Sequence, residues 1–435
     1  MTLDEERPGG VGGTAPVGGS PVTSDPVPGP RPVRPHPLAV RARTAWSDNA
    51  RALAVAAVGT IALRVVTEWV GLVSQFGVNF PHEVAKRPSL LSQVWGHWDA
   101  GYYLSIAQYG YAGRVVGPGQ AAHGIAFAPM YPWGIRAVHW VTPLNWTASA
   151  ELLSAGAVFV ALTALHRLAS SFGGDDMGGA SVMLLLAFPT AFFLLAPYPE
   201  SLALAFVAVA LVCARRERWM LAGLCAAGAT LTKYFLVVLA VALCVSVIGT
   251  WMRDPARREG DRRAAVLWTR LGEVAGPTVA VLVAWMVFQQ VHLGNALAFA
   301  QAQSAQWHRH VGAPWTLAYR TGSDLVHWRF LDTSTASVTE LFDTVTVLLL
   351  AGAAVYAYRR LSRSTGVLLG LALCIVTFQT YLQSVTREVL VFAPLFVVLG
   401  AWTVKRRWLE RLLLALFIPC GYFLIQRYVT GAFAG

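Results

Sequence analysis

Long apolar runs separated by short polar and basic segments dominate the pattern of positions along this chain. Many of the runs approach the roughly 20 residues that a helix needs to cross a bilayer. The pattern predicts an all-α polytopic membrane protein with about eleven transmembrane helices. We expect these helices at 52–76, 148–168, 179–196, 200–214, 219–233, 235–251, 273–293, 339–358, 366–382, 389–404 and 409–428.

Basic residues gather at the ends of the apolar runs rather than along one soluble surface. Arginines accumulate this way on the cytoplasmic side of membrane proteins, where they can also contact anionic headgroups. Placing every cluster inside puts the N-terminus in the cytoplasm and the C-terminus outside. Two large outer loops follow, at 77–147 and 294–338. The clusters are Arg215/Arg216/Arg218, Arg253/Arg257/Arg258/Arg262/Arg263, Arg359/Arg360/Arg363 and Lys405/Arg406/Arg407/Arg411.

Two stretches complicate this threading. Residues 125–141 are apolar, but they contain Pro129, Pro132 and Arg136, and a span here would place the next basic cluster outside. We therefore interpret 125–141 as an interfacial helix on the outer surface. The hairpin formed by 200–214 and 219–233 is short for two spans.

The N-terminal region differs in composition from the rest of the chain. Residues 1–37 contain nine prolines and seven glycines, which leaves too little apolar area to offset the entropy of ordering. We predict a disordered cytoplasmic tail over 1–50 and a single transmembrane domain over 51–435.

Composition narrows the function. Apolar residues make up 55% of the chain and charged residues 13%, and the net charge of +11 lies in the separated clusters, which argues against a nucleic-acid partner. No P-loop or Gly-rich strand-to-helix turn is present to hold a nucleotide. A transferred group would therefore come from a lipid-linked donor. The five cysteines show no CxxC spacing, and we predict neither a metal nor a cofactor.

The first outer loop contains Trp95-Gly96-His97-Trp98-Asp99-Ala100-Gly101-Tyr102-Tyr103-Leu104-Ser105-Ile106. Trp95, Trp98, Tyr102 and Ile106 recur at helical spacing, which predicts an aromatic helix face on the membrane surface. Asp99 at its edge could accept a proton from a hydroxyl delivered there. The alternative is that Asp99 caps or solvates the helix.

Further candidates lie in the outer turns. Glu200 in Tyr198-Pro199-Glu200-Ser201 either caps the next helix or holds a sugar hydroxyl or a cation. Lys233 lies between two apolar runs and either snorkels or binds substrate. Arg387 either pairs with the adjacent Glu388 or binds a phosphate.

The second outer loop contains Gln303-Ser304-Ala305-Gln306-Trp307-His308-Arg309-His310, which is dense in hydrogen-bond donors. We assign Arg309 to substrate binding. The two histidines are a poor metal motif because no third ligand follows at helical spacing. Within the first helix, Arg64 and Glu68 are expected to pair across one turn, with a proton path as the alternative.

These segments together resemble the PIG-V group of GPI mannosyltransferases and its bacterial relatives. The similarity lies in HWDAGYYLSIAQYGY (97–111), in His123 before Ala126-Phe127-Ala128-Pro129, in Pro189 through Tyr198-Pro199-Glu200-Ser201, and in GNALAFAQAQSAQWHR (294–309). Ala122, Pro199 and Lys233 depart from the family pattern. An Arg- and Ala-rich composition suggests a bacterium of high G+C content, for which a GPI acceptor is improbable.

The resemblance implies a GT-C-like bundle in the bacterial plasma membrane, with an extracytoplasmic active site. It implies inverting transfer of a sugar, most simply mannose, from a polyprenyl phosphate to a hydroxyl of a glycolipid, glycan or protein. Asp99 would be the base, and the substrate-binding residues would be Trp98, Tyr102, His123, Glu200, Lys233, Arg309 and Arg387.

Two other functions remain open from the sequence. A multi-pass lipid or solute transporter would explain the helices and the basic face, but we see no internal repeat. A scaffold for envelope assembly would need no particular acid in the first outer loop.

Overall fold

The computed structural model describes residues 37–78, 95–111, 124–253, 262–307, 312–327, 335–432 and Ala434. Within these ranges the regular elements are helices, and no strand is present. The predicted all-α fold is therefore confirmed. The chain divides into two units, 1–46 and 47–435, and the helical bundle belongs to the second.

The first half of the described chain ends at Arg253. Its elements are α1 (Pro37–Val78), α3 (Asp99–Tyr109), α5 (Met130–Val141), α6 (Trp146–Gly173), α7 (Asp175–Ala187), the 3₁₀ turn η2 (Ala191–Leu194), α8 (Glu200–Arg215), α9 (Trp219–Thr232), η3 (Tyr234–Val237) and α10 (Val238–Arg253).

The second half begins with the longest helix after α1. Its elements are α11 (Arg262–Leu293), α12 (Ala298–Trp307), α13 (Pro314–Val326), α14 (Thr335–Tyr356), the π-turn η6 (Ala357–Leu361), α15 (Arg363–Thr377), α16 (Val385–Glu388), η7 (Val389–Val391), α17 (Ala393–Thr403) and α18 (Arg407–Val429).

Several of these helices have the length and hydropathy of a membrane span. Six described segments qualify, or seven if the bent pair Val385–Val391 and Ala393–Thr403 is one span. Each of the eleven segments expected from the sequence contains a helix. The chain is thus a multi-pass helical membrane protein, while the count of eleven spans is not confirmed because several helices are shorter than a bilayer requires.

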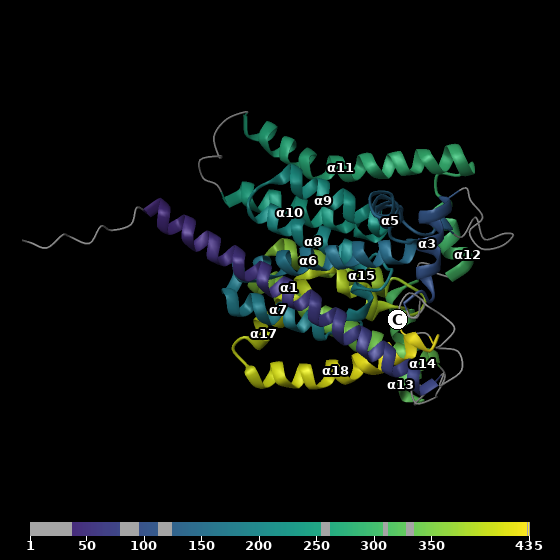
Figure 1. Ribbon diagram of the computed structural model, residues 1–435. Coiled ribbons are helices and arrows are strands. Elements are labelled where there is room, and N and C mark those ends of the chain that lie inside the picture. The colour runs from purple at the N-terminus through teal and green to yellow at the C-terminus, as the bar shows by residue number, and fades with distance from the viewer. Residues whose placement is uncertain are drawn as a thin grey trace, which may run out of the picture. The chain divides into compact units, whose positions relative to one another are not determined.

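Small residues allow the central helices to approach closely. α6 packs against α7 and α8, α8 against α9, and α9 against α11, which runs along one side of the group while α18 runs along the other (Figure 1). A Cβ at Gly223 would meet the backbone of Glu273 and Val274. Such contacts are how helices associate where no hydrophobic effect drives them together.

The outer segments contain helices of their own. α5 falls within the predicted interfacial segment 125–141, with Tyr131 and Ile135 buried and Trp140 and Val141 exposed. This one-sided burial agrees with an amphipathic helix, and its level in a membrane stays a prediction. α1 begins at Pro37, so helix extends back into the segment assigned to the tail, while residues 1–36 lie outside the described residues.

A sharp bend interrupts the segment predicted as one helix at 389–404. The short helical run Val385–Val391 meets α17 at an angle of 89°. Phe392 breaks the helical backbone at the bend, and Pro394 lies in the first turn of α17, where the missing N–H costs nothing. The bend lets the run carrying Arg387 turn into the bundle instead of continuing the axis of α17.

Charged residues inside the first span are paired, as expected. Arg64 Nη2 lies 2.8 Å from Glu68 Oε1 and 2.8 Å from Glu151 Oε2 of α6. The predicted Arg64–Glu68 pair is confirmed, and the additional partner Glu151 ties α1 to α6.

Candidate active site

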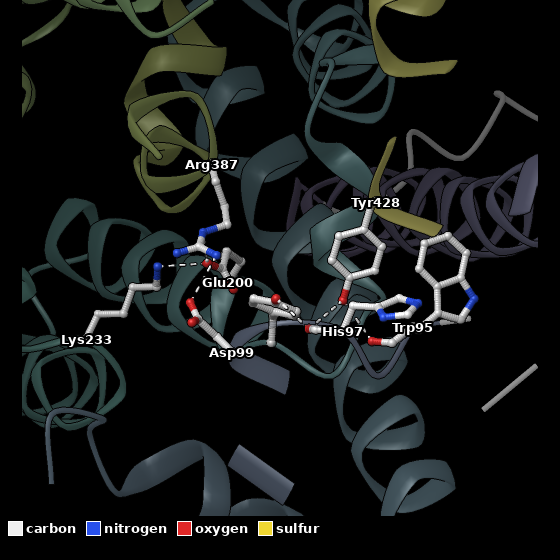
Figure 2. A network of polar contacts seen from close by, with 8 residues as sticks. Trp95, His97, Asp99, Glu200, Lys233, Arg387 and Tyr428 are labelled. Carbon is white, nitrogen blue, oxygen red and sulfur yellow. Dashed lines mark hydrogen bonds and ion pairs between the residues drawn. The ribbon is translucent and has the colours of Figure 1, made fainter. Parts of the chain in front are cut away.

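Four charged side chains from distant parts of the chain meet at one end of the bundle. Asp99 is the first residue of α3, Glu200 is the first residue of α8, Lys233 directly follows α9, and Arg387 lies in α16. Figure 2 shows Asp99, Lys233 and Arg387 directed toward Glu200. Each is at or beside a helix end, where the chain turns and a side chain can leave the packed bundle.

Ion pairs connect these four side chains. Lys233 Nζ lies 2.8 Å from Glu200 Oε1, and Arg387 Nε lies 3.4 Å from the same oxygen. Arg387 Nη1 reaches Asp99 Oδ2 at 3.2 Å. Two cations therefore face two carboxylates, which offsets the cost of placing charges in a poorly solvated site.

Glu200 occupies the centre of this network. Its side chain is 1% exposed, against 24% for Asp99. It is not among the residues that line the adjacent cavity. Its Oε2 atom is buried and has no hydrogen-bond partner among the described residues. Glu200 is thus placed to hold Lys233 and Arg387, which is the cation-binding alternative left open by the sequence.

A cavity of about 500 Å³ opens beside the network. Asp99, Lys233 and Arg387 line it together with several aromatic side chains. This combination of charged groups and ring faces suits a ligand that carries both an anion and a sugar. The other lining residues are Trp98, Tyr103, Ala126, Phe127, Ala128, Thr232, Tyr234, Phe235, Phe299, Gln303, Gln383, Ser384 and Glu388.

Two tyrosine hydroxyls fix the turn that precedes Asp99. Tyr198 and Tyr428 donate to the carbonyl oxygen of His97 at 3.0 and 3.1 Å, and Tyr428 also reaches the carbonyl of Trp95 at 2.9 Å. Trp95 is 2% exposed and stacks on Tyr428. The turn is thus clamped against the interior, as Figure 2 shows, and Asp99 begins α3 from a fixed position.

Burial keeps the tyrosines around this turn in their neutral form, in which they donate hydrogen bonds. Burial, with nearby carboxylates in support, raises the pKa of Tyr103 and Tyr198 well above the usual value of 10.0. Both phenols stay protonated at physiological pH, so neither is a base. Burial also lowers the pKa of His97, which favours its neutral form. His97 does not line the cavity, whereas Asp99 does, so Asp99 is the one placed to meet a hydroxyl there.

Asp343 holds the backbone next to Arg387 through Thr386, and the sequence patterns did not predict this role. This carboxylate is 2% exposed, and its Oδ1 atom accepts from Thr386 N at 2.7 Å and Thr386 Oγ1 at 2.8 Å. Thr190 Oγ1 donates to the carbonyl of Thr386 at 2.7 Å. The backbone next to Arg387 is therefore held from α14 and from the turn before η2. An acid inside the apolar run 339–358 was the available signal.

The buried face of α3 differs from the expected one. Ala100, Tyr103, Ile106 and Ala107 are buried, whereas Trp98 is 51% exposed. The expected stripe of Trp95, Trp98, Tyr102 and Ile106 is wrong because α3 begins only at Asp99. Trp98 has a positive φ of 58°, a backbone conformation that a right-handed helix does not contain. The helical spacing therefore does not extend back to Trp98 and Trp95.

The predicted site residues are distributed as follows. Asp99, Trp98, Lys233 and Arg387 line the cavity, while Tyr102 stacks on Phe127, with ring centroids 4.9 Å apart. His123 and Arg309 lie outside the described residues. Of the described ranges, none brings three His, Cys, Asp or Glu side chains together as metal ligands, and independence from a metal stays a prediction.

Comparison with known proteins gives fold similarity alone. Neither a family model nor a curated protein matches the sequence. Among solved structures, the Archaeoglobus fulgidus oligosaccharyltransferase in complex with zinc and sulfate is 12% identical, with a TM-score of 0.44 over 88% of this chain and 53% of that one. The same organism's AglB, in complex with an inhibitory peptide and a dolichol phosphate, is 12% identical, with a TM-score of 0.43 over 89% and 56%.

The chain thus spans about half the length of these oligosaccharyltransferases. At this level of similarity no residue role is transferred from those structures, and the functional argument rests on the site.

Proposed function

We propose that this protein is an inverting glycosyltransferase, a mannosyltransferase of the PIG-V-like type, that uses a polyprenyl-phosphate donor. The observation that carries the proposal is the placement of Asp99 beside Lys233 and Arg387 in one aromatic-lined cavity. A carboxylate that can take a proton and two cations that can hold a phosphate are the groups that such a transfer needs.

Asp99 is the proposed base. As the acceptor oxygen attacks the anomeric carbon, its proton passes to the carboxylate. Asp99 Oδ2 contacts Arg387, while Oδ1 has no hydrogen bond to any residue that the structure describes. That oxygen is available to the acceptor hydroxyl. General-base assistance of this kind contributes on the order of 10²–10⁴-fold.

Lys233 and Arg387 are the proposed leaving-group cations. The bond from the anomeric carbon to the phosphate oxygen breaks, and its electron pair leaves with the polyprenyl phosphate. Glu200 fixes both cations before the substrate arrives, so little reorganisation is needed as charge develops. The departing phosphate requires no proton, and the cations stabilise its added charge.

The contact between Arg387 and Asp99 implies that the donor binds before Asp99 acts on the acceptor. In the resting site the guanidinium is shared between Asp99 and Glu200. An incoming phosphate competes for the same N–H groups, since bidentate Arg–phosphate contacts are strong. Donor binding therefore draws Arg387 from Asp99 and leaves the carboxylate for the acceptor.

Other features of the chain fit the same reaction. Trp98 presents its ring at the cavity and would stack on the sugar. The multi-pass helices suit a polyprenyl donor that stays in the bilayer. The basic clusters support a site on the extracytoplasmic side of a bacterial plasma membrane. The acceptor is a hydroxyl of a glycolipid, glycan or protein.

The test is a transfer assay in detergent with radiolabelled polyprenyl-phosphate-mannose and an envelope extract as acceptor. Asp99→Asn keeps the size of the side chain and removes the base, so we expect transfer to fall about 10²–10⁴-fold. Binding of the labelled donor should persist.

Asp175→Asn is the matched control. Asp175 also pairs with an arginine, Arg51, at 2.7 Å, but this pair lies at the surface and outside the cavity. The control should transfer like the wild type. Wild-type turnover in Asp99→Asn would reject the mechanism, and movement of the intact donor across the bilayer without a covalent product would favour transport.

A further inference from the structure

A second cavity lies at the other end of the same helices. α8 begins at Glu200 in the candidate active site and ends at Arg215, which lines the second cavity. α10 follows Lys233 and η3 and ends at Arg253, which lines it too. With a rise of about 1.5 Å per residue, the 16 residues of α8 separate its two ends by about 24 Å.

The second cavity has a volume of about 720 Å³ and lies where membrane spans end. Tyr234–Arg253 and Thr339–Leu361 both qualify as spans, and their last residues, Arg253 and Leu361, are lining residues. A cavity at the ends of two spans lies at the depth of lipid headgroups on one membrane surface.

Three arginines dominate the charge of this cavity. Arg215, Arg253 and Arg363 line it, and in the described part of the chain none forms an ion pair with a carboxylate. The lining acid is Glu217, which pairs with Arg270 at 3.4 Å. The cavity therefore carries an excess of positive charge that no described residue neutralises.

The protein orients two of these guanidinium groups without using all of their donors. Arg215 Nη2 donates to the carbonyl of Ser171 at 3.2 Å, and its guanidinium stacks 4.0 Å from the ring of Phe172. Arg253 Nε donates to the carbonyl of Gly249 at 2.9 Å. A guanidinium has five N–H donors, so most remain for a ligand.

The rest of the wall indicates the kind of anion. The first turn of α15 contributes Arg363, Ser364 and Thr365, and the N-terminus of a helix favours phosphate groups. Apolar side chains, which we call the apolar wall, line the same cavity: Leu168, Phe172, Leu211, Leu243, Val245 and Leu361. Arginines and an apolar wall in one cavity match a phosphate joined to an acyl chain.

We propose that this cavity binds the phosphate of an anionic phospholipid, at a site separate from the candidate active site. The three arginines hold the phosphate oxygens, and the apolar wall receives the start of an acyl chain. The proposal does not depend on the transfer reaction. A free phosphate ion would contact the arginines but would not need the apolar wall, and this difference is measurable.

The experiment measures binding of phosphatidylglycerol to the full-length protein in detergent by native mass spectrometry, with phosphatidylcholine, a zwitterionic lipid of zero net charge, as the reference. The test variant is Arg215→Gln/Arg253→Gln/Arg363→Gln. An arginine near a headgroup contributes about fivefold in affinity, so we expect a loss on the order of a hundredfold. Arg216→Gln/Arg360→Gln/Arg411→Gln removes equal charge from exposed residues that do not line the cavity, and should bind like the wild type.

The single variant Arg363→Gln is the safeguard in case the triple variant misfolds, because the Arg363 side chain makes no contact that the fold relies on among the described residues. We expect its affinity for phosphatidylglycerol to fall about fivefold. Millimolar inorganic phosphate should not displace the lipid. Displacement would overturn the lipid assignment and give the site to free phosphate. Equal binding by both triple variants, or equal losses in both, would overturn the site itself.

Discussion

Helix α8 has a carboxylate at one end and an arginine at the other, and the surroundings of the two ends differ. At the first end, Glu200 is buried between Lys233 and Arg387, and each charge has a partner. At the second end, arginines are held by carbonyl oxygens and by an aromatic ring. Charges paired with carboxylates are fixed in position, whereas arginines held through one N–H keep donors for a ligand. This difference is the basis for proposing chemistry at the first end and ligand binding at the second.

Replacing Glu200, the central carboxylate of the first end, should have the largest effect on transfer and on stability. Glu200→Gln leaves two poorly solvated cations without their shared partner, which costs about 3–5 kcal/mol. We expect loss of transfer by at least about a hundredfold and a lower melting temperature in detergent. The double variant Glu200→Gln/Lys233→Met should recover part of the stability because one uncompensated charge is gone. A fully stable Glu200→Gln protein would contradict the paired character of this end.

Asp343 offers a smaller test at the same end. Asp343→Asn keeps the shape of the side chain but weakens the support of Thr386, so Arg387 loses its fixed position. We expect the turnover of transfer to fall about tenfold, since small misplacements of a positioning group have such effects. Asp175→Asn is again the control. An effect on stability with unchanged turnover would show that Asp343 acts on the fold alone.

Ionic strength should affect lipid binding at the second end of α8 more than transfer at the first end, with smaller effects than the substitutions above. Raising ionic strength from about 0.1 M to about 1 M shortens the Debye length from about 10 Å to about 3 Å. Phosphatidylglycerol binding at the exposed arginines should weaken severalfold, while Asp99-dependent transfer at saturating donor should change less than twofold. Equal salt dependence of both would remove the distinction between paired and unpaired charges.

The mildest change concerns the turn before Asp99. Tyr198→Phe removes one of two hydroxyls that hold the His97 carbonyl, a hydrogen bond of about 1 kcal/mol. Transfer should fall about fivefold, because Tyr428 still holds the turn. Tyr428→Phe removes two contacts and should cost more. The reverse ranking of these two variants would contradict the clamp.

The same tyrosines predict a pH dependence. Burial raises the pKa of Tyr198 above the usual 10.0, so its contribution to stability is present below pH 10 and is lost as pH rises above that value. We expect no alkaline loss of transfer from this group below about pH 10. A titration of the wild type against Tyr198→Phe measures it, and an inflection near pH 8 that the variant lacks would contradict it.

Hydropathy was sufficient to locate the long apolar helices, because a bilayer demands long apolar runs, but it did not predict α12 and α13. The sequence also singled out Asp99, Glu200, Lys233 and Arg387, which the structure brings together, and their roles stay proposals. The sequence did not show which charges pair, because Asp99 and Arg387 are far apart along the chain. The buried face of α3 was missed because the left-handed Trp98 delays the start of the helix.

The second cavity could not be predicted from the sequence for a different reason. The arginines that line it were interpreted as a signature of topology, and each belongs to a separate cluster at the end of a separate run. Only the packing of α8, α10 and α15 brings them together. Asp343 was missed for a related reason, because its partner Thr386 lies on an element whose 89° bend was not expected.

α8 also restricts how this protein can change in length. Each residue of a helix turns it by about 100° and advances it by about 1.5 Å. One residue inserted between Glu200 and Arg215 would therefore rotate one end away from its cavity while the other stayed in place. Substitutions along α8 can accumulate wherever packing allows, but a single-residue insertion or deletion cannot satisfy both ends. The helix acts as a spacer of fixed register between two sites.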